Sequence, residues 1–444
     1  MDSRRESKRL RDVDVTEMYA LKLGALWRAL RREHLSLWML CFYFFFEYVR
    51  PQSLYPVIDI LPWAQISLGL SMITAILDRS VRWTEHIQNK LLVLFLTIVI
   101  ISGVFAFRPA ESLHFWTQFG GWAMAYFLVI NVVNTERRLL LFLLAYCLFS
   151  LKMAQHGTIA WASRGFSFAS YGLIGSPGWF RNSGEYAIQM LIYGSLAISI
   201  VYALKDRWGI YKKWILYTAA STGYIAIMGA SSRGSQLALG AIGIWWLLKL
   251  KGGMRALLVI SLLAFALYHL LPEEQMRRFS EMGSDDSSQQ RLTYWQFAID
   301  EVIPTHPVIG IGYHNWLTYT NFKHPEGMGP YGVVEEVHNI YLQAASELGF
   351  TGLTAFLILV IISFVANART RKNAQILNNR FYYFVSYGLD AGLIGFLVAG
   401  SFVTVLYYPF FWIQFAMIAM LNNVSCMQVK AVKKQAARTR KAIT

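Results

Sequence analysis

Long apolar runs recur along almost the whole chain, and they constrain its fold more than any other feature of the sequence. A helix that crosses a bilayer needs about 20 mostly apolar residues. The chain is 55% hydrophobic and 15% charged, whereas a soluble globular chain carries roughly 25% charged residues. Too few polar side chains remain to cover a water-exposed surface. We therefore expect an all-α polytopic membrane protein, and the high hydrophobicity excludes a disordered chain.

The apolar runs predict about twelve transmembrane helices. They cover residues 35–49, 57–77, 91–107, 113–133, 138–153, 185–204, 213–230, 235–249, 254–272, 350–367, 382–401 and 404–424. The positive-inside rule assigns their orientation, because cytoplasmic loops carry an excess of Lys and Arg. With both termini cytoplasmic, 31 of the 41 Lys and Arg residues lie inside and 10 lie outside. This placement predicts a multi-pass membrane protein with an even number of spans.

The spans divide the chain into five regions. They are a basic cytoplasmic N-terminal segment (1–34), nine helices (35–272), a large periplasmic loop (273–349), three helices (350–424) and a basic cytoplasmic tail (425–444). The net charge of +15 is explained by basic residues on the inner face, where they attract anionic membrane lipids. A nucleic-acid partner is therefore not expected.

The large loop contains two predicted helices. The first covers 291–303 and is ended by Pro304 and Pro307. The second covers 334–348, where apolar residues recur on one face, and Gly349 is expected to cap it.

Arg233 is the most informative charge on the predicted outer side. It stands in a short turn, Ser231-Ser-Arg-Gly-Ser235, between two apolar spans. Its planar guanidinium matches the oxygens of a phosphate group. The alternative is an interfacial arginine whose head reaches water.

Two further arginines could contact the same anion. Arg291 follows the Asp285-Asp286 turn, and its alternative is a solvated arginine or a partner of those carboxylates. Arg181 precedes a span and is an equally good interfacial anchor.

His338 is a candidate general base, because neutral imidazole accepts a proton near pH 7. Glu335 stands three residues earlier, so on a helix it could orient the ring or raise its basicity. The alternative is a polar surface histidine. Neither paired outer histidines with metal-ligand spacing nor a nucleotide-binding glycine motif occurs in the sequence, so no metal and no cofactor is expected.

The ordered motifs of residues 225–366 resemble the O-antigen ligase/polymerase superfamily. They are Ser231-Ser-Arg-Gly-Ser235, Arg291-x3-Trp295, Pro307-Val-Ile-Gly-Ile-Gly312 and His338-Asn-x-Tyr-Leu-x4-Glu347-x-Gly349-x2-Gly352. In the N-terminal half, Glu47-Tyr-Val-Arg-Pro-Gln52 is similar to a branch of ligase-like proteins of exopolysaccharide and exosortase systems.

The resemblance implies a glycosyltransferase of the GT-C type. Such a ligase transfers O-antigen glycan from undecaprenyl pyrophosphate to lipid A-core oligosaccharide on the periplasmic face. It implies that Arg233 and Arg291 bind the donor pyrophosphate and that His338 is catalytic. Arg181, Glu335 and Asn339 are candidates for supporting roles.

Three alternatives remain open at this point. An O-antigen polymerase would use another lipid-linked glycan as acceptor, and a protein O-oligosaccharyltransferase would use a Ser or Thr hydroxyl. A transporter of polyprenyl-linked glycan belongs to a different class and favours charges near the membrane midplane. Asp390 is the strongest residue of that kind.

Overall fold

The computed structural model describes residues 15–81, 83–167, 172–249 and 283–443. Within these ranges the chain is helical, and the β interactions consist of one bridge between Met328 and Val333. The predicted all-α fold is therefore confirmed for the described residues.

The described residues of the N-terminal half form one 3₁₀ turn and eight α-helices. They are α2 (Val15–Tyr19), α3 (Leu23–Arg31), α4 (Leu35–Tyr48), α5 (Pro51–Leu54), η1 (Pro56–Ile58), α6 (Trp63–Leu77), α7 (Ile87–Val104), α8 (Pro109–Val132) and α9 (Glu136–Ser163). The central part contains α10 (Ser183–Leu204), η2 (Lys205–Arg207), α11 (Ile210–Gly229) and α12 (Arg233–Lys249). The C-terminal part contains α15 (Asp286–Phe297), η3 (Ala298–Val302), α16 (Ile303–Thr305), α17 (Trp316–Lys323), α18 (Ile340–Ile376), α19 (Arg380–Gly400) and α20 (Pro409–Ile443).

An α-helix lies at each predicted span that falls within the described residues, and the span predicted for 254–272 lies outside them. Among the described residues, six helices are long and apolar enough to cross a membrane. They are Ile87–Val104, Glu136–Ser163, Ser183–Arg207, Ile340–Ile376, Arg380–Gly400 and Pro409–Thr439. These helices support a polytopic membrane protein, while the total of twelve spans stays a prediction.

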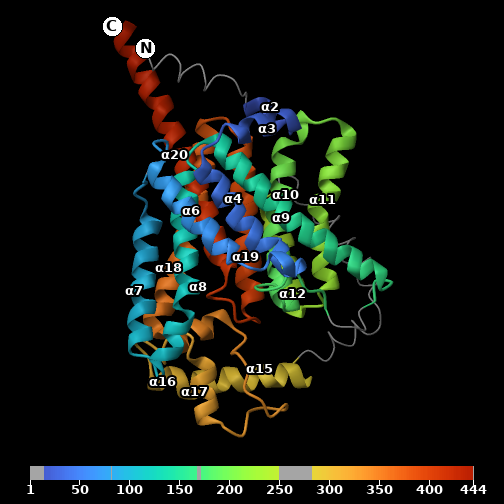
Figure 1. Ribbon diagram of the computed structural model, residues 1–444, viewed down its shortest axis with the longest axis vertical. Coiled ribbons are helices and arrows are strands. Elements are labelled where there is room, and N and C mark those ends of the chain that lie inside the picture. The colour runs from blue at the N-terminus through green and yellow to red at the C-terminus, as the bar shows by residue number, and fades with distance from the viewer. Residues whose placement is uncertain (1–14, 82, 168–171, 250–282, 444) are drawn as a thin grey trace.

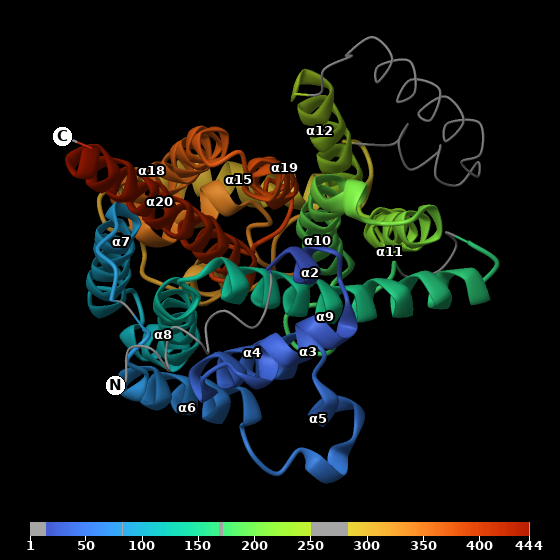
Figure 2. The same cartoon turned by 90° about the horizontal axis from the view of Figure 1, so that it is seen from above.

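Two helices form the centre of the bundle. The most apolar windows of α10 and α20 are each 89% buried, compared with 28% for α7. Helix α10 packs on α19, α11 and α12, while α20 packs on α8 and α18. Figure 2 shows α10 behind α9, between α11 and α19.

The two ends of the bundle differ in what covers them. In Figure 1, α2, α3 and the C-terminal end of α20 lie at the upper end, whereas α15, α16 and α17 lie together at the lower end. The short helices of the large loop pack around a core of their own, which includes Tyr294, Trp316 and Val337. The first described helices, α2 and α3, and the C-terminal end of α20 therefore lie at the opposite end of the bundle from α15, α16 and α17.

Helix α18 is interrupted at Gly349, which has φ 69° and ψ −173°. A Cβ atom at this position would lie 2.2 Å from the Val308 carbonyl oxygen. The loop with the Pro307-to-Gly312 motif runs along this break, and Ile311 N donates to Ser346 O at 2.8 Å. The expected cap at Gly349 is confirmed. The Pro307-to-Gly312 motif packs against the break in α18.

The helix predicted for 334–348 is wrong at its start. The structure begins α18 only at Ile340, because Asn339 is its N-cap and His338 has φ 52°. The segment that carries Glu335 and His338 is therefore non-helical. The helix predicted for 291–303 begins earlier than expected, at Asp286, and helical structure continues through η3 and α16 to Thr305.

Candidate active site

The N-termini of three helices meet at one cavity of about 280 Å³. Asn182, Ser183 and Gly184 line it from the start of α10, Ser231 to Gly234 from the start of α12, and Asp285 and Ser287 from the start of α15. Arg291, His338, Phe402 and Val403 complete its wall. Helix N-termini carry partial positive charge and unpaired N–H groups, so their convergence creates an anion-binding environment.

Close helix packing brings these termini together. A Cβ atom at Gly184 would lie 2.9 Å from the Val403 side chain, and one at Gly234 would lie 2.7 Å from the Phe402 side chain. At α10 the N-cap Asn182 accepts from Gly184 N at 2.9 Å, and Glu185 completes a capping box. The Phe402-Val403 turn therefore contacts α10 and α12 at the wall of the cavity.

Arg233 is the first residue of α12, and its guanidinium is held by a carboxylate in the structure. Its Nη1 and Nη2 atoms donate to the two oxygens of Asp285 at 3.0 and 2.8 Å. These hydrogen bonds lower the pKa of Asp285 to about 2. The bidentate geometry is the one that a phosphate group would also use, so Asp285 occupies the fork that an anionic ligand would need.

Arg291 lies one turn into α15 and faces the same cavity. Among the described residues it makes no hydrogen bond and no ion pair. Desolvation and the neighbouring Arg233 lower its pKa. Two arginines and one aspartate line the cavity, so its formal charge is +1 when His338 is neutral. The alternative in which Arg291 pairs with Asp285 is not seen, because Asp285 binds Arg233 instead.

His338 lies at the cavity wall, in the non-helical segment that precedes α18. Its side chain is 23% exposed, and its backbone N–H donates to Thr404 Oγ1 at 2.8 Å. Burial, and secondly the charge of Arg291, lower the pKa of the imidazole to about 4. The ring is therefore neutral at pH 7 and has a free lone pair, as a proton acceptor requires.

The three candidates for supporting roles do not line the cavity. Glu335 Oε2 is 3.8 Å from His338 Nε2, too far for a hydrogen bond, and it does not raise the pKa of the ring. Asn339 caps α18 by accepting from Tyr341 N and Leu342 N at 2.9 and 3.1 Å. Arg181 is exposed beside the start of α10. The structure therefore brings together Arg233, Arg291 and His338 alone from the predicted set.

Sequence reasoning missed Asn182, the pairing of Asp285 with Arg233 and the Phe402–Thr404 turn. The pattern Asn182-Ser-Gly-Glu185 has the spacing of a helix N-terminus and could have indicated the start of α10. Phe402, Val403 and Thr404 had no comparable signal, since their role depends on a turn between α19 and α20 packing on distant residues.

An apolar groove of about 510 Å³ adjoins the cavity and shares Arg233, Gly234, Arg291 and Phe402 with it. Leu237 and Gly240 of α12 and Leu292 and Trp295 of α15 also line the groove. The cavity thus has charged side chains in its wall, and the groove that adjoins it is mainly apolar. Across the described residues there is no group of three or more His, Cys, Asp or Glu that could hold a metal ion.

The geometry is that of a polytopic membrane protein with a cavity at which three helix N-termini and two arginines meet. Residues 217–357 match the model of the O-antigen ligase family. The matched segment contains Arg233, Arg291 and His338, and over this segment the chain is similar to that family. No curated protein matches the chain.

Proposed function

We propose that the protein is an inverting, metal-independent O-antigen ligase. It transfers glycan from undecaprenyl pyrophosphate to a sugar hydroxyl of lipid A-core oligosaccharide. The observation that carries this proposal is the shared cavity of Arg233, Arg291 and His338 at three helix N-termini. This arrangement combines an anion site with a proton acceptor, which are the two requirements of the reaction.

The pyrophosphate of the donor binds at the two arginines. The bond that breaks joins the anomeric carbon to a pyrophosphate oxygen, so negative charge grows on the leaving group. Guanidinium groups and helix N-termini stabilise that charge without a metal ion. Donor binding at Arg233 requires that its fork be shared with or released by Asp285.

The polyprenyl tail follows the apolar groove between α12 and α15. The groove begins at the same arginines and is lined further on by Leu237, Leu292 and Trp295. A ligand with an anionic head and a long apolar tail fits this sequence of environments. Both spaces therefore support a lipid-linked donor.

His338 accepts the proton of the acceptor hydroxyl as that oxygen attacks the anomeric carbon. Attack from the face opposite the leaving group inverts the configuration. A positioned base contributes typically about 10²–10⁴ in rate. A bound pyrophosphate would offset the charge of Arg291 and raise the pKa of His338, which improves the base once the donor is in place.

The cavity faces the periplasm, and both chain termini lie in the cytoplasm. The excess of Lys and Arg at the other end supports this orientation. A transporter is less well supported, because Asp390 is fully buried and bonds to Asn367 and Arg371 at 2.7 and 2.6 Å. Such a compensated pair is explained by bundle stability alone.

The acceptor separates the ligase from its two related alternatives. The test is glycan transfer by the purified protein with one lipid-linked donor and three acceptors: lipid A-core, a second lipid-linked glycan and an acceptor protein. We expect transfer to lipid A-core, with or without EDTA. Product with the second lipid-linked glycan alone would identify a polymerase, and product with the protein alone a protein glycosyltransferase.

The matched control for this assay is His338→Gln. Glutamine can hold a hydroxyl by hydrogen bonding, but it cannot take its proton. Single-turnover transfer should fall about 10²–10⁴-fold while donor binding is retained. Transfer near the wild-type rate would leave His338 only a positioning role.

A further inference from the structure

Helix α3 presents three different faces along nine residues. Leu23, Leu26, Trp27 and Leu30 follow the i, i+3, i+4, i+7 pattern and form one apolar row. Leu23 is 82% exposed and Trp27 is 55% exposed. The small residues Ala25 and Ala29 are buried against the protein. Such a division is typical of a helix that lies in the membrane interface.

The remaining face of α3 is basic. Arg28 and Arg31 are exposed and stand one turn apart. Arg28 contacts Glu17 at 3.2 Å while its side chain stays 55% exposed. Arg31 has neither a hydrogen bond nor an ion pair among the residues that the structure describes. Positive charge is therefore available beside the apolar row.

The apolar row forms one wall of a groove of about 580 Å³. Helix α4 supplies Trp38 and Phe42, and helix α9 supplies Leu144, Ala145 and Leu148. Its lining residues are all apolar or aromatic, apart from the weakly polar thiol of Cys41. A volume in this range is typical of pockets that bind small-molecule ligands. Helix α9 is one of the helices that are long and apolar enough to cross the membrane.

We propose that this groove is a binding site for an anionic phospholipid. An acyl chain fills the space between α3, α4 and α9, and the phosphate headgroup contacts Arg28 and Arg31. The site lies at the end of the molecule with α2 and α3, away from α15 (Figure 1). It is therefore separate from the donor cavity and does not depend on the proposed transfer reaction.

Charge complementarity favours a lipid over a second copy of the chain. A symmetric contact through α3 would place its basic row next to the same row of the partner, and like charges would repel. An anionic headgroup instead satisfies the arginines, while the hydrocarbon covers the exposed leucines and Trp27. One molecule thus matches both faces.

Native mass spectrometry of the detergent-purified protein tests the site with phosphatidylglycerol and phosphatidylcholine of equal chain length. We expect preferential binding of phosphatidylglycerol. Arg28→Gln with Arg31→Gln should weaken that binding about fivefold for each lost charge. The control is Lys433→Gln with Lys434→Gln, which removes the same charge from an exposed part of α20 and should leave the preference unchanged.

A second variant tests the groove without changing charge. Ala145→Trp fills the space below α3 and should weaken phosphatidylglycerol binding at least as much, even if the double arginine variant folds poorly. Thermal unfolding and retained phosphatidylcholine adducts report folding. Equal binding of both lipids, equal loss in the lysine control, unchanged binding in Ala145→Trp or a dimer that Ala145→Trp disrupts would each overturn the proposal.

Discussion

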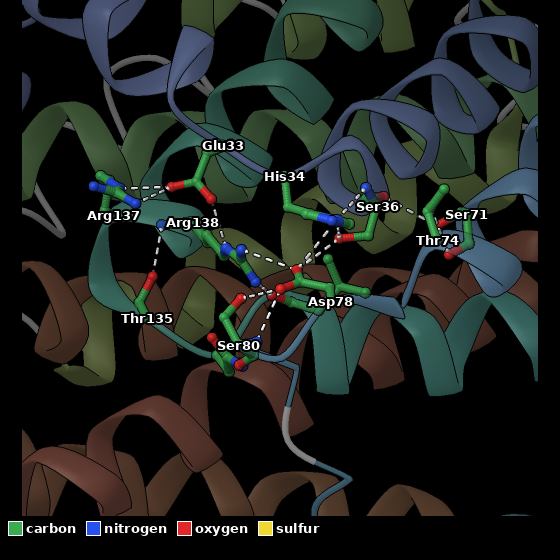
Figure 3. Close-up of polar contacts among 12 residues, drawn as sticks. Glu33, His34, Ser36, Ser71, Thr74, Asp78, Ser80, Thr135, Arg137 and Arg138 are labelled. Carbon is green, nitrogen blue, oxygen red and sulfur yellow. Dashed lines mark hydrogen bonds and ion pairs between the residues drawn. The ribbon is translucent and has the colours of Figure 1, made fainter. Parts of the chain in front are cut away.

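Arginines occupy two polar regions of this molecule, and the two regions treat them differently. At the junction of α3, α4, α6 and α9, Arg138 is 5% exposed and lies between two carboxylates. Its Nε donates to Glu33 at 2.6 Å and its Nη2 to Asp78 at 3.2 Å (Figure 3). Its Nη1 donates to Val132 O at 2.9 Å. In the candidate active site, Arg291 is part-exposed, and the described residues give it no such partner.

The difference lies in charge balance. Glu33 also contacts Arg137 at 2.5 Å, so the first region holds two arginines and two carboxylates. Ser36 and Ser80 add hydrogen bonds to Asp78 (Figure 3). That region is neutral, buried and saturated, and it fixes four chain segments to one another. The candidate site keeps a formal charge of +1 around open space. A saturated region stabilises the fold, whereas an unsaturated one can bind a ligand.

Removal of one arginine from each region should give opposite results. Arg138→Met removes the arginine that Glu33 and Asp78 share and leaves two buried carboxylates with Arg137 as the remaining arginine, which typically costs about 3–5 kcal/mol. Arg291→Met removes a desolvated charge near Arg233 and should change the free energy of unfolding by less than about 1 kcal/mol, yet lower transfer about 10²–10³-fold. Unfolding in mixed micelles and single-turnover transfer measure the two effects. A stable Arg138→Met protein would contradict the structural role of that region.

A lysine at each site arginine separates charge from geometry. Arg233→Lys and Arg291→Lys keep a positive charge but lose the planar fork. The loss of a charge-assisted hydrogen bond is worth roughly 1.5–3 kcal/mol, so transfer should fall about 10–100-fold with folding intact. Transfer and thermal unfolding are measured on the same preparations. Wild-type transfer by Arg291→Lys would return this residue to a solvated surface role.

The same comparison explains how far the sequence could be interpreted. Charge counts and apolar runs predicted the helices of the described spans, because membrane insertion depends on local composition. Arg233 and Arg291 were selected as candidates because few other charges lie on the predicted outer side of the membrane. The role of Arg138 was missed, since Glu33 and Asp78 are 105 and 60 residues away in the chain. It had been counted only as one more inner-face charge.

Local periodicity also predicted a helix wrongly around His338. Apolar residues between Val334 and Leu348 recur at helical spacing, yet Val337 packs in the core of the large loop while His338 turns to a positive φ. The hydrogen bond from His338 N to Thr404 and the cap at Asn339 replace the helical pattern there. The cap at Asn339 is local, but the contact with Thr404 is 66 residues away in the chain, and no sequence window contains it.

A smaller effect is expected at Asp285. Its ion pair with Arg233 makes the candidate site partly resemble the region around Arg138, where each charge has a partner. Asp285→Asn removes the carboxylate that binds Arg233 and raises the formal charge of the cavity to +2. Donor affinity should rise about fivefold, the equivalent of roughly 1 kcal/mol for a partly exposed ion pair. Asp286→Asn is the matched control, because Asp286 is the exposed neighbour in the same turn. Weaker donor binding by Asp285→Asn would show that Asp285 positions Arg233 rather than competing for it.

The pH dependence of transfer tests the smallest difference, the one between the empty and the occupied cavity. In the free protein the pKa of His338 is about 4, so the base stays neutral over the whole range above pH 5. The value of kcat/KM for the donor reports the free protein and should be flat from pH 8 to 5, then fall toward pH 4. A bound pyrophosphate offsets Arg291 and favours the protonated ring, so kcat should begin to fall at a higher pH than kcat/KM. In Arg291→Gln the separation between the two profiles should shrink, because the charge that the donor offsets has gone.

Thermal unfolding across the same range shows whether the fold is intact, since a depressed histidine pKa destabilises the native state as pH falls from about 6.5 to about 4. A fall of kcat/KM near pH 6.5, the ordinary value for histidine, would mean that His338 is solvated in the free protein and that the cavity does not control its protonation.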